Sequence, residues 1–506
     1  MSFETNNFNV AKKYWLEKNE FNVECNISSG ENIKNILVSS IEASVENYEL
    51  KNGELAFSGN IDLKIVLMNE NDEINTICSV CPFSSKFVNE NLEIGQNAVI
   101  NVKVVDYNID SVTSGNIKIL VSLMQSGFVV CNKEIRKINC NSDDVCTKNE
   151  DMEIINYLLA KQETFEIESE VNVRDKIKKL ILTESNVIVK NIEADTNCVV
   201  LTGEINSNIL YINENDKFES GYISDSFKQE IEALGVAKDS IIEGRAFIKQ
   251  EKIVTEIAEE EKGCKIIVKN PVSVDICVYN TETMTIVKDL YSTKNEINVT
   301  TESFQMTKAI NCETIERKID GAIVLENDKP RIDKIMFFGG NNVMITNNYI
   351  QDGQLTLEGI AKTNVVYLND DENSWNSVQL EIPFVINDKV NFDNEGELNI
   401  DAIVYDVDVS AKKGREIEYN AKIKVNINCY CEQTNAVISE VSQGERYQEK
   451  DCAMEVVFGK QGEELWNIAK NIKIKEEQIL SQNPGVAFPL TDDSPLIIFY
   501  QKINEN

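Results

Sequence analysis

The chain has 506 residues, of which 42% are hydrophobic, and this content suffices for several packed cores and excludes a disordered chain. Its 50 Lys and Arg face 84 Asp and Glu, and the net charge of −34 repels phosphate backbones, so we expect no nucleic-acid partner. The sequence has no histidine, which removes Ser-His and Cys-His catalytic pairs as well as His metal ligands. We therefore expect a multi-domain protein that is not an enzyme and carries no cofactor.

The opening residues and the hydropathy pattern bear on location. The start, MSFETNNFNVAKKYWLEKNEF, lacks the basic segment followed by an apolar one that a secretory signal has. No run approaches the roughly 20 apolar residues of a membrane helix. Thirteen cysteines, an odd number scattered along the chain, suit reduced thiols. We expect a cytoplasmic protein without a membrane span.

In chain order, an N-terminal segment (residues 1–20) comes first, and within it Val10–Asn19 is expected to form a short helix. One stretch then occurs three times, as LAFSGNIDLKIVLMN, VVLTGEINSNILYIN and LTLEGIAKTNVVYLN. The copies centre on Gly59, Gly203 and Gly359. Ten positions after each Gly lies an Asn, namely Asn69, Asn213 and Asn369. A module that has been duplicated in this way predicts an array of domains.

Apolar residues alternate along each copy, for example Leu55, Phe57 and Ile61, and the Gly lies on the same face. We interpret the Gly as the mark of a bulge or of a close approach by a neighbouring backbone, not as a ligand site. About 110 residues with several alternating strands predict a β-sandwich or open barrel for each copy. The expected modules are residues 21–130, which are the most divergent, 163–280 and 317–430.

Polar segments separate these modules and are expected to be linkers. They span residues 131–162, 281–316 and 431–452. In the first of them, Ile154, Ile155, Leu158 and Leu159 form an i, i+1, i+4, i+5 stripe, which predicts a helix. Modules joined by such linkers are expected to unfold partly independently.

The pattern changes in residues 453–502. Met454–Phe458 alternates like a strand, and a helix follows an acidic pair whose charge suits a helix N-terminus. A second helix, Glu476–Gln482, ends before a proline, and Leu496–Tyr500 is typical of a last strand. We therefore predict a small C-terminal domain with the order βααβ.

The segment GEELWNIAKNIKIKEEQILSQNP, followed by PLIIFY, resembles a LysM domain. Where that family usually has Asp-Thr and a later Gly, this chain has Glu463-Glu464 and Ser494-Pro495. The resemblance implies a ligand groove between two loops, Lys460–Leu465 and Asn483–Leu490. The residues expected to bind a partner protein or a glycan are Gly462, Glu463, Glu464, Leu465, Asn483, Pro484, Gly485, Val486 and Phe488.

Three further expectations concern this domain. Trp466 is expected in the core, because its helical position lies beside other apolar residues. An exposed Phe488 would serve as an anchor for a protein partner, and the pair Asp492-Asp493 is a further contact candidate. The alternative is that all of the candidate contact residues are ordinary loop residues.

The three repeats resemble the SPOCS domains of endospore-forming Firmicutes. The Gly-centred strand ending in Tyr-x-Asn and the KPRIDKI stretch at Lys329–Ile335 carry the resemblance. SPOCS modules followed by one LysM domain are similar to the SipL family of spore morphogenesis proteins. This implies a non-enzymatic scaffold for the endospore envelope, its coat and cortex. Its LysM end would dock on a coat-morphogenetic ATPase at the forespore surface, in the mother-cell cytoplasm. The alternative is a LysM protein that binds peptidoglycan or N-acetylglucosamine oligomers.

Cys78 and Cys81 form a Cys-x-x-Cys spacing that could indicate zinc or redox chemistry. A structural zinc site needs four ligands, and without His a second Cys pair must supply two of them. Cys429 and Cys431 have the wrong spacing for this. We therefore expect no metal site.

Overall fold

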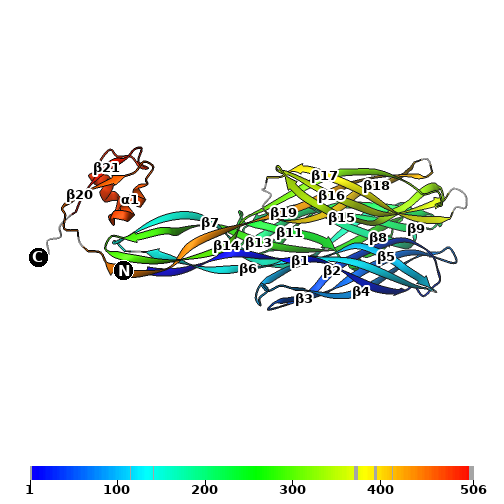
Figure 1. Cartoon of the computed structure of the whole chain (residues 1–506). Helices are drawn as coiled ribbons and strands as arrows, with labels where there is room; N and C mark the ends of the chain where they lie inside the picture. The colour runs from blue at the N-terminus through cyan, green and yellow to red at the C-terminus, as the bar shows by residue number, and fades with distance from the viewer. Residues whose placement is uncertain are drawn as a thin grey trace.

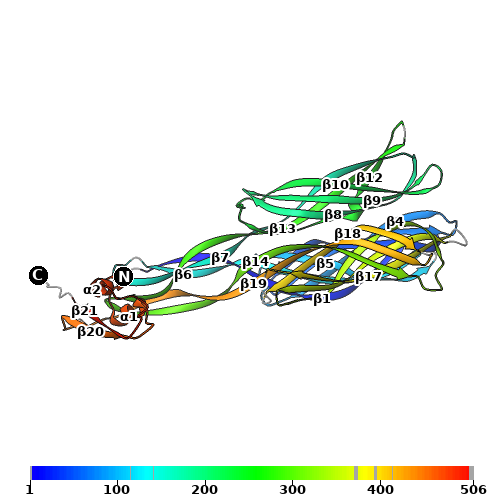
Figure 2. The ribbon, with the colours of Figure 1, turned by 90° about the horizontal axis from the view of Figure 1, so that it is seen from above.

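The structure is a computed structural model that describes residues 3–113, 115–140, 142–261, 263–369, 374–391, 396–412, 414–448 and 450–500. It is mainly β, as predicted from the alternating pattern. The molecule is elongated, with a head of packed sheets, a stalk of long strands and a small unit with two helices at the far end of the stalk (Figures 1 and 2).

The strands fall into three repeats with a common order. Repeat 1 contains β1 (Phe3–Ser28), β2 (Ile33–Lys51), β3 (Glu54–Asn69), β4 (Ile74–Val88), β5 (Asn97–Thr113) and β6 (Asn116–Cys140). Repeat 2 contains β7 (Val145–Val173), β8 (Ile177–Asp195), β9 (Cys198–Asn213), β10 (Phe218–Glu232), β11 (Ile241–Ile248), the 3-10 turn η1 (Gln250–Lys252), β12 (Val254–Glu259) and β13 (Cys264–Ser292). Repeat 3 contains β14 (Asn295–Val324), β15 (Ile332–Gln351), β16 (Gln354–Asn369), β17 (Trp375–Lys389), β18 (Glu397–Lys412) and β19 (Glu416–Arg446).

Each repeat has two antiparallel sheets. One is a three-stranded meander with the Gly-centred strand in the middle: β2-β3-β4, β8-β9-β10 or β15-β16-β17. The other joins the first and last strands of the repeat to a strand that follows the meander: β1-β6-β5, β14-β19-β18, and β7 with β11-β13-β12. Leu55, Ile61 and Leu63 of β3 lie in a core with residues of β5 and β6, so the core of repeat 1 lies between its two sheets.

The repeated glycine is a packing requirement. Gly59 pairs with Val45 at a bulge on one side and with Phe83 on the other. A Cβ added to Gly59 would lie 2.0 Å from the backbone oxygen of Ser44 and 2.7 Å from the Phe83 ring. Gly203 and Gly359 meet a phenylalanine ring and a backbone oxygen in the same way. The predicted bulge and close backbone approach are therefore confirmed at all three positions.

The repeated asparagine closes the hairpin that follows the central strand. The Oδ1 atom of Asn69 accepts the backbone N–H groups of Asn71 and Glu73, at 3.0 and 2.9 Å. Asn213 accepts two N–H groups at the same relative positions. A short amide that satisfies turn donors explains why the residue recurs with the glycine.

The first and last strands of each repeat continue far beyond the head and pair along their whole length. Beyond the head they form three two-stranded ribbons, which together make the stalk (Figure 1). The ribbons comprise residues 3–12 with 131–140, 145–156 with 280–292, and 295–309 with 431–446. These ribbons cover half of the N-terminal segment and most of each of the three segments predicted as linkers, so the linker interpretation is wrong.

Both helices predicted in these segments are also wrong. Val10–Asn19 lies in β1, and Ile154 to Leu159 lies in β7. Ile154 and Ile155 are both buried, and they belong to different apolar clusters on opposite faces of the same strand. A strand that is covered on both faces loses its alternation, which is why its apolar residues imitate a helical stripe.

Apolar clusters that draw on all three repeats hold the ribbons and the head together. One stalk cluster contains Phe8, Val10, Ile135, Ile154, Ile286, Phe304, Met306 and Val437. In the head, the three meander sheets meet through Leu37, Val38, Val66, Met68, Ile74, Ile181, Leu182, Leu210, Phe337 and Val366. Each buried side chain of this size contributes about 1.5–3 kcal/mol. The three repeats therefore form one body, and the polar connectors expected between them are absent from the described residues.

The C-terminal unit, here called the tip, has the predicted order of strand, helix, helix and strand. It contains β20 (Met454–Gly459), α1 (Leu465–Ile472), α2 (Glu476–Gln482) and β21 (Ser494–Phe499). β20 and β21 pair antiparallel, and the helices cover one face of this two-stranded sheet. The tip lies at the end of the stalk (Figure 1). Tyr291 of the second ribbon packs in the core of the tip.

Candidate functional site

The two loops predicted to form a groove meet in the tip. The Gly462 N–H donates to the Leu490 oxygen at 2.8 Å, and the Leu490 N–H donates to the Glu463 oxygen at 3.1 Å. The Glu463 carboxylate accepts the Lys460 N–H at 3.0 Å, which closes the first loop on itself. The structure therefore brings Lys460–Leu465 and Asn483–Leu490 together.

Three of the predicted contact residues are open to a ligand. Gly462 and Gly485 have φ values of 81° and 93°, and a Cβ added to either would have nothing within 4 Å. Pro484 is also exposed. The backbone at these positions is exposed on both loops, close to where the loops meet.

Other predicted residues are structural. Asn483 is buried, donates to the Ile479 and Ile497 oxygens at 2.9 Å each, and accepts the Ile497 N–H at 2.7 Å. Leu465, Val486 and Phe488 pack against the core of the tip. Phe488 is half-buried there, so the expectation of an exposed anchor is wrong.

The remaining predicted residue, Glu464, faces the stalk. Its carboxylate forms an ion pair with Lys148 of β7 at 2.8 Å. Nearby, the Trp466 indole N–H donates to Asp289 of β13 at 2.9 Å, and Lys470 bonds both oxygens of Asp289 at 2.7 and 2.8 Å. Burial opposes ionisation of Asp289, but these two donors hold its pKa below the usual value. Trp466 is buried as predicted, and this contact fixes α1 to the stalk.

Sequence reasoning missed the outer face of the tip sheet. Met454, Val456 and Phe458 point away from the helices, and Phe458 is 76% exposed. Directly across from them lie Phe499, Ile497 and Pro495, also exposed. The signal was present as alternation in Met454–Phe458, but the pattern does not reveal which of two apolar faces is covered.

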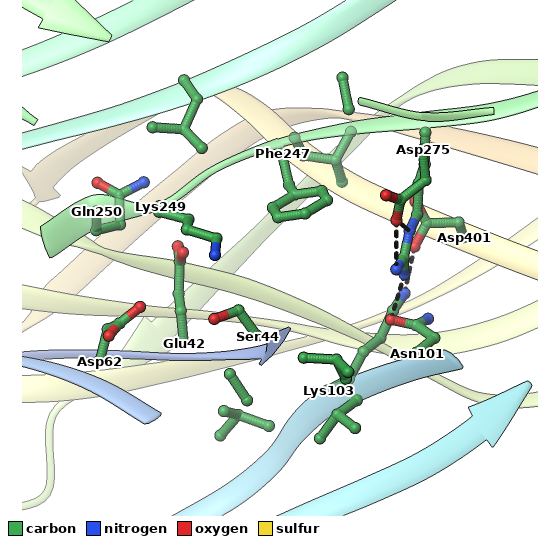
Figure 3. Close-up of a pocket in the computed structure, with 18 of the residues that line it drawn as sticks. Glu42, Ser44, Asp62, Asn101, Lys103, Phe247, Lys249, Gln250, Asp275 and Asp401 are labelled. Carbon is green, nitrogen blue, oxygen red and sulfur yellow. Dashed lines mark hydrogen bonds and ion pairs between the residues drawn. The ribbon is translucent and has the colours of Figure 1, made fainter. Parts of the chain in front are cut away.

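The head contains a second candidate, a cavity of about 470 Å³ where the three repeats meet (Figure 3). Three of the cations that line it are each paired with an acidic residue. Arg245 donates to Asp275 at 2.9 Å, Lys103 pairs with Asp401 of repeat 3, and Lys249 pairs with Glu46 of repeat 1. These ion pairs link neighbouring strands or repeats, and they leave the cations no free charge for an anionic ligand.

Two further carboxyl groups at the cavity have raised pKa values. Burial, with repulsion from Glu184 and Asp62, raises the pKa of Glu42 to about 8. Burial also raises the pKa of Asp62 to about 8, and a hydrogen bond that Asp62 shares with Glu251 adds to the shift. The Glu42 side chain is exposed to solvent inside the cavity, whereas Asp62 is buried. The cavity wall is therefore close to neutral.

In the described part of the chain, the arrangement of possible metal ligands and the length of the helices bear on metal binding and on membrane spanning. Cys78 is exposed, whereas Cys81 is half-buried and faces Cys25 of β1. In the ranges that the structure describes, no group of three or more Cys, Asp or Glu is arranged to hold a metal ion. Of the helices in those ranges, none is long and apolar enough to cross a membrane.

No protein-family model and no curated protein matches this chain. Its class is therefore defined by the fold and the site: a mainly β protein whose long paired strands hold a small βααβ unit at the end of a stalk.

Proposed function

We propose that the protein is a non-enzymatic scaffold of endospore envelope assembly that docks on a coat-morphogenetic ATPase through its tip. The repeats are SPOCS-like modules and the tip is a LysM-like domain in this proposal. Its place of action is the mother-cell cytoplasm at the forespore surface.

The observation that carries the proposal is the contrast in packing along the molecule. Shared apolar clusters seal the repeats against one another, whereas the tip is held at the far end of the stalk by a few contacts. A long rigid body with one exposed binding unit is suited to hold a partner at a fixed distance. The cavity in the head has its cations paired, which does not favour catalysis there.

The test is binding between the purified full chain and a purified coat-morphogenetic ATPase from the same cells. We expect a specific complex that a variant lacking residues 450–506 does not form. Fluorescent tagging in sporulating cells supplies the second readout, a shell around the forespore. A diffuse signal together with no binding would reject the proposal.

A second candidate function is binding of peptidoglycan or N-acetylglucosamine oligomers by the tip. The observation in its favour is the bare backbone at Gly462 and Gly485, where the two loops meet. Titration of N-acetylglucosamine oligomers into the full chain tests it. Absence of heat at millimolar ligand would dismiss the glycan function.

A further inference from the structure

One edge of the two-stranded tip sheet is closed by side chains. The Phe499 N–H donates to Gln482 at 2.9 Å, and the Phe499 oxygen accepts from Gln478 and Gln482. Asn483 satisfies both backbone groups of Ile497. The outer edge of β21 therefore has its backbone groups paired, and no further strand can add there.

The edge of β20 is open. The Tyr500 N–H donates to the Ala453 oxygen at 3.0 Å, which places Ala453 and Tyr500 at a hydrogen-bonded position of the ladder. Hydrogen-bonded and non-bonded pairs alternate in an antiparallel ladder. The register then directs the backbone groups of Met454, Val456 and Phe458 away from β21. Within the part of the chain that the structure describes, no hydrogen bond from outside the β20–β21 ladder reaches the backbone of these three residues.

The same three residues carry the exposed apolar face. Their side chains and those of Pro495, Ile497 and Phe499 form a continuous patch on the side of the sheet opposite the helices. An open strand edge combined with an exposed apolar face is a template for another strand. The exposed apolar face by itself could bind any apolar surface. The open edge of β20, however, can form backbone hydrogen bonds only with an extended chain.

The charge of the tip indicates which kind of strand can bind at the edge of β20. Residues 450–500 carry eight carboxylates against five lysines, and the whole chain has a net charge of −34. A second copy of this chain would bring the same acidic charge to the contact, whereas a strand with basic residues would be attracted.

We propose that β20 binds an extended, basic segment of a partner protein, which adds to the tip sheet as a third strand. Residues of that segment opposite Met454, Val456 and Phe458 bond to them through the backbone and place apolar side chains on the same face. The alternate residues are basic. The proposal deepens the proposed function, on which it rests only for the view that the tip docks a protein.

The test uses heptapeptides of alternating lysine and valine with the full chain. In one peptide the backbone nitrogens of the lysines are methylated. In its matched control the backbone nitrogens of the valines are methylated instead. Both have the same charge, but only the first keeps the N–H groups that face β20. We expect the peptide methylated at its lysine backbone nitrogens to bind at least tenfold more tightly than the control peptide, as measured by fluorescence anisotropy.

A pair of variants supplies the second control. Val456→Pro removes an edge N–H that the sheet itself does not use, and Val456→Thr keeps it. We expect Val456→Pro to abolish the difference between the two peptides and Val456→Thr to preserve it. Equal affinity of the two peptides, or no binding of either at millimolar concentration, would overturn strand addition.

The outcome is separable from that of the proposed function. A full chain that binds the coat-morphogenetic ATPase but does not distinguish the peptides retains its function and loses this docking mode. Peptide discrimination without ATPase binding leaves the strand site in place and rejects the proposed partner.

Discussion

The repeats and the tip solve the same problem, the burial of apolar sheet faces, in opposite ways. In the repeats, both faces of the central strands are covered, one by the partner sheet and the other by the neighbouring repeats. In the tip, the helices cover one face of the sheet and leave the other bare. The covered region suits a rigid support, and the bare region suits a contact.

The largest effect is expected where the stalk enters the head. Lys13 of repeat 1 and Glu243 of repeat 2 are both buried and lie 3.0 Å apart, and the Lys13 Nζ lies 3.3 Å from the Tyr430 ring centre of repeat 3. Glu243→Gln leaves the lysine without its counter-charge and should lower the free energy of unfolding by about 3–5 kcal/mol. Denaturant unfolding measures it.

The double variant Lys13→Met/Glu243→Gln is the control for this prediction. Because it removes both charges, it should be less destabilised than Glu243→Gln alone. If the double variant lost as much stability as the single variants Lys13→Met and Glu243→Gln lose together, the two side chains would not stabilise the contact between the repeats as a pair.

The next effect concerns the repeated glycine. In Gly359→Ala the new Cβ would lie 2.5 Å from the Phe384 ring and 2.6 Å from the Met344 oxygen, so we expect a loss of about 1–3 kcal/mol. Gly221→Ala is the matched control, since its Cβ would meet nothing closer than 3.9 Å. Equal stability of the two variants in urea unfolding would remove the packing explanation.

The cavity predicts a pH dependence of stability. Glu42 and Asp62 titrate near 4 in an unfolded chain and near 8 in the folded protein. Between these values the folded state retains protons that the unfolded chain has released, so stability falls from about pH 4 to about pH 8 and then levels. Glu184 and Glu251 strengthen the effect, and Lys64 and Lys249 oppose it.

The variant Glu42→Gln/Asp62→Asn should flatten this slope by several degrees in Tm between pH 5 and pH 9, measured by calorimetry. Glu49→Gln, at an exposed site, is the control and should keep the slope of the unchanged protein. An unchanged slope in the double variant would contradict the assignment.

The smallest effect is expected between the tip and the stalk. Asp289→Asn weakens the bonds to Lys470 and should cost about 1–2 kcal/mol locally. Limited proteolysis near residues 447–453 should then speed up while global stability barely changes. Lys148→Gln removes only an exposed ion pair and should have little effect. Equal cleavage rates in both variants would mean that Asp289 does not hold the tip.

The sequence predicted the parts of the fold that local patterns encode. Alternation around Gly59 predicted the central strand, and the glycine on its apolar face predicted the bulge, whereas the closing turn at Asn69 emerged only from the structure. The tip could be predicted because its order of elements is contained in about 50 residues. The stalk could not, because β14 pairs with β19, more than 100 residues away, and local patterns carry no trace of such pairing.

The sequence likewise predicted only those parts of the candidate site that local patterns encode. The loops at Gly462 and Gly485 were recognisable, and they do meet. The packing of Phe488 against the tip core and the contact of Glu464 with the stalk depend on tertiary structure. The apolar run through Val66 and Met68 could have indicated a strand covered on both faces, and hence the contact between repeats.

Hydrogen exchange of the full chain, with and without a purified coat-morphogenetic ATPase, tests most directly whether the repeats are the support and the tip is the contact. We expect new amide protection in β20 and the neighbouring tip loops, and none in the meander sheets of the three repeats. Protection confined to the head, with β20 unchanged, would contradict this expectation.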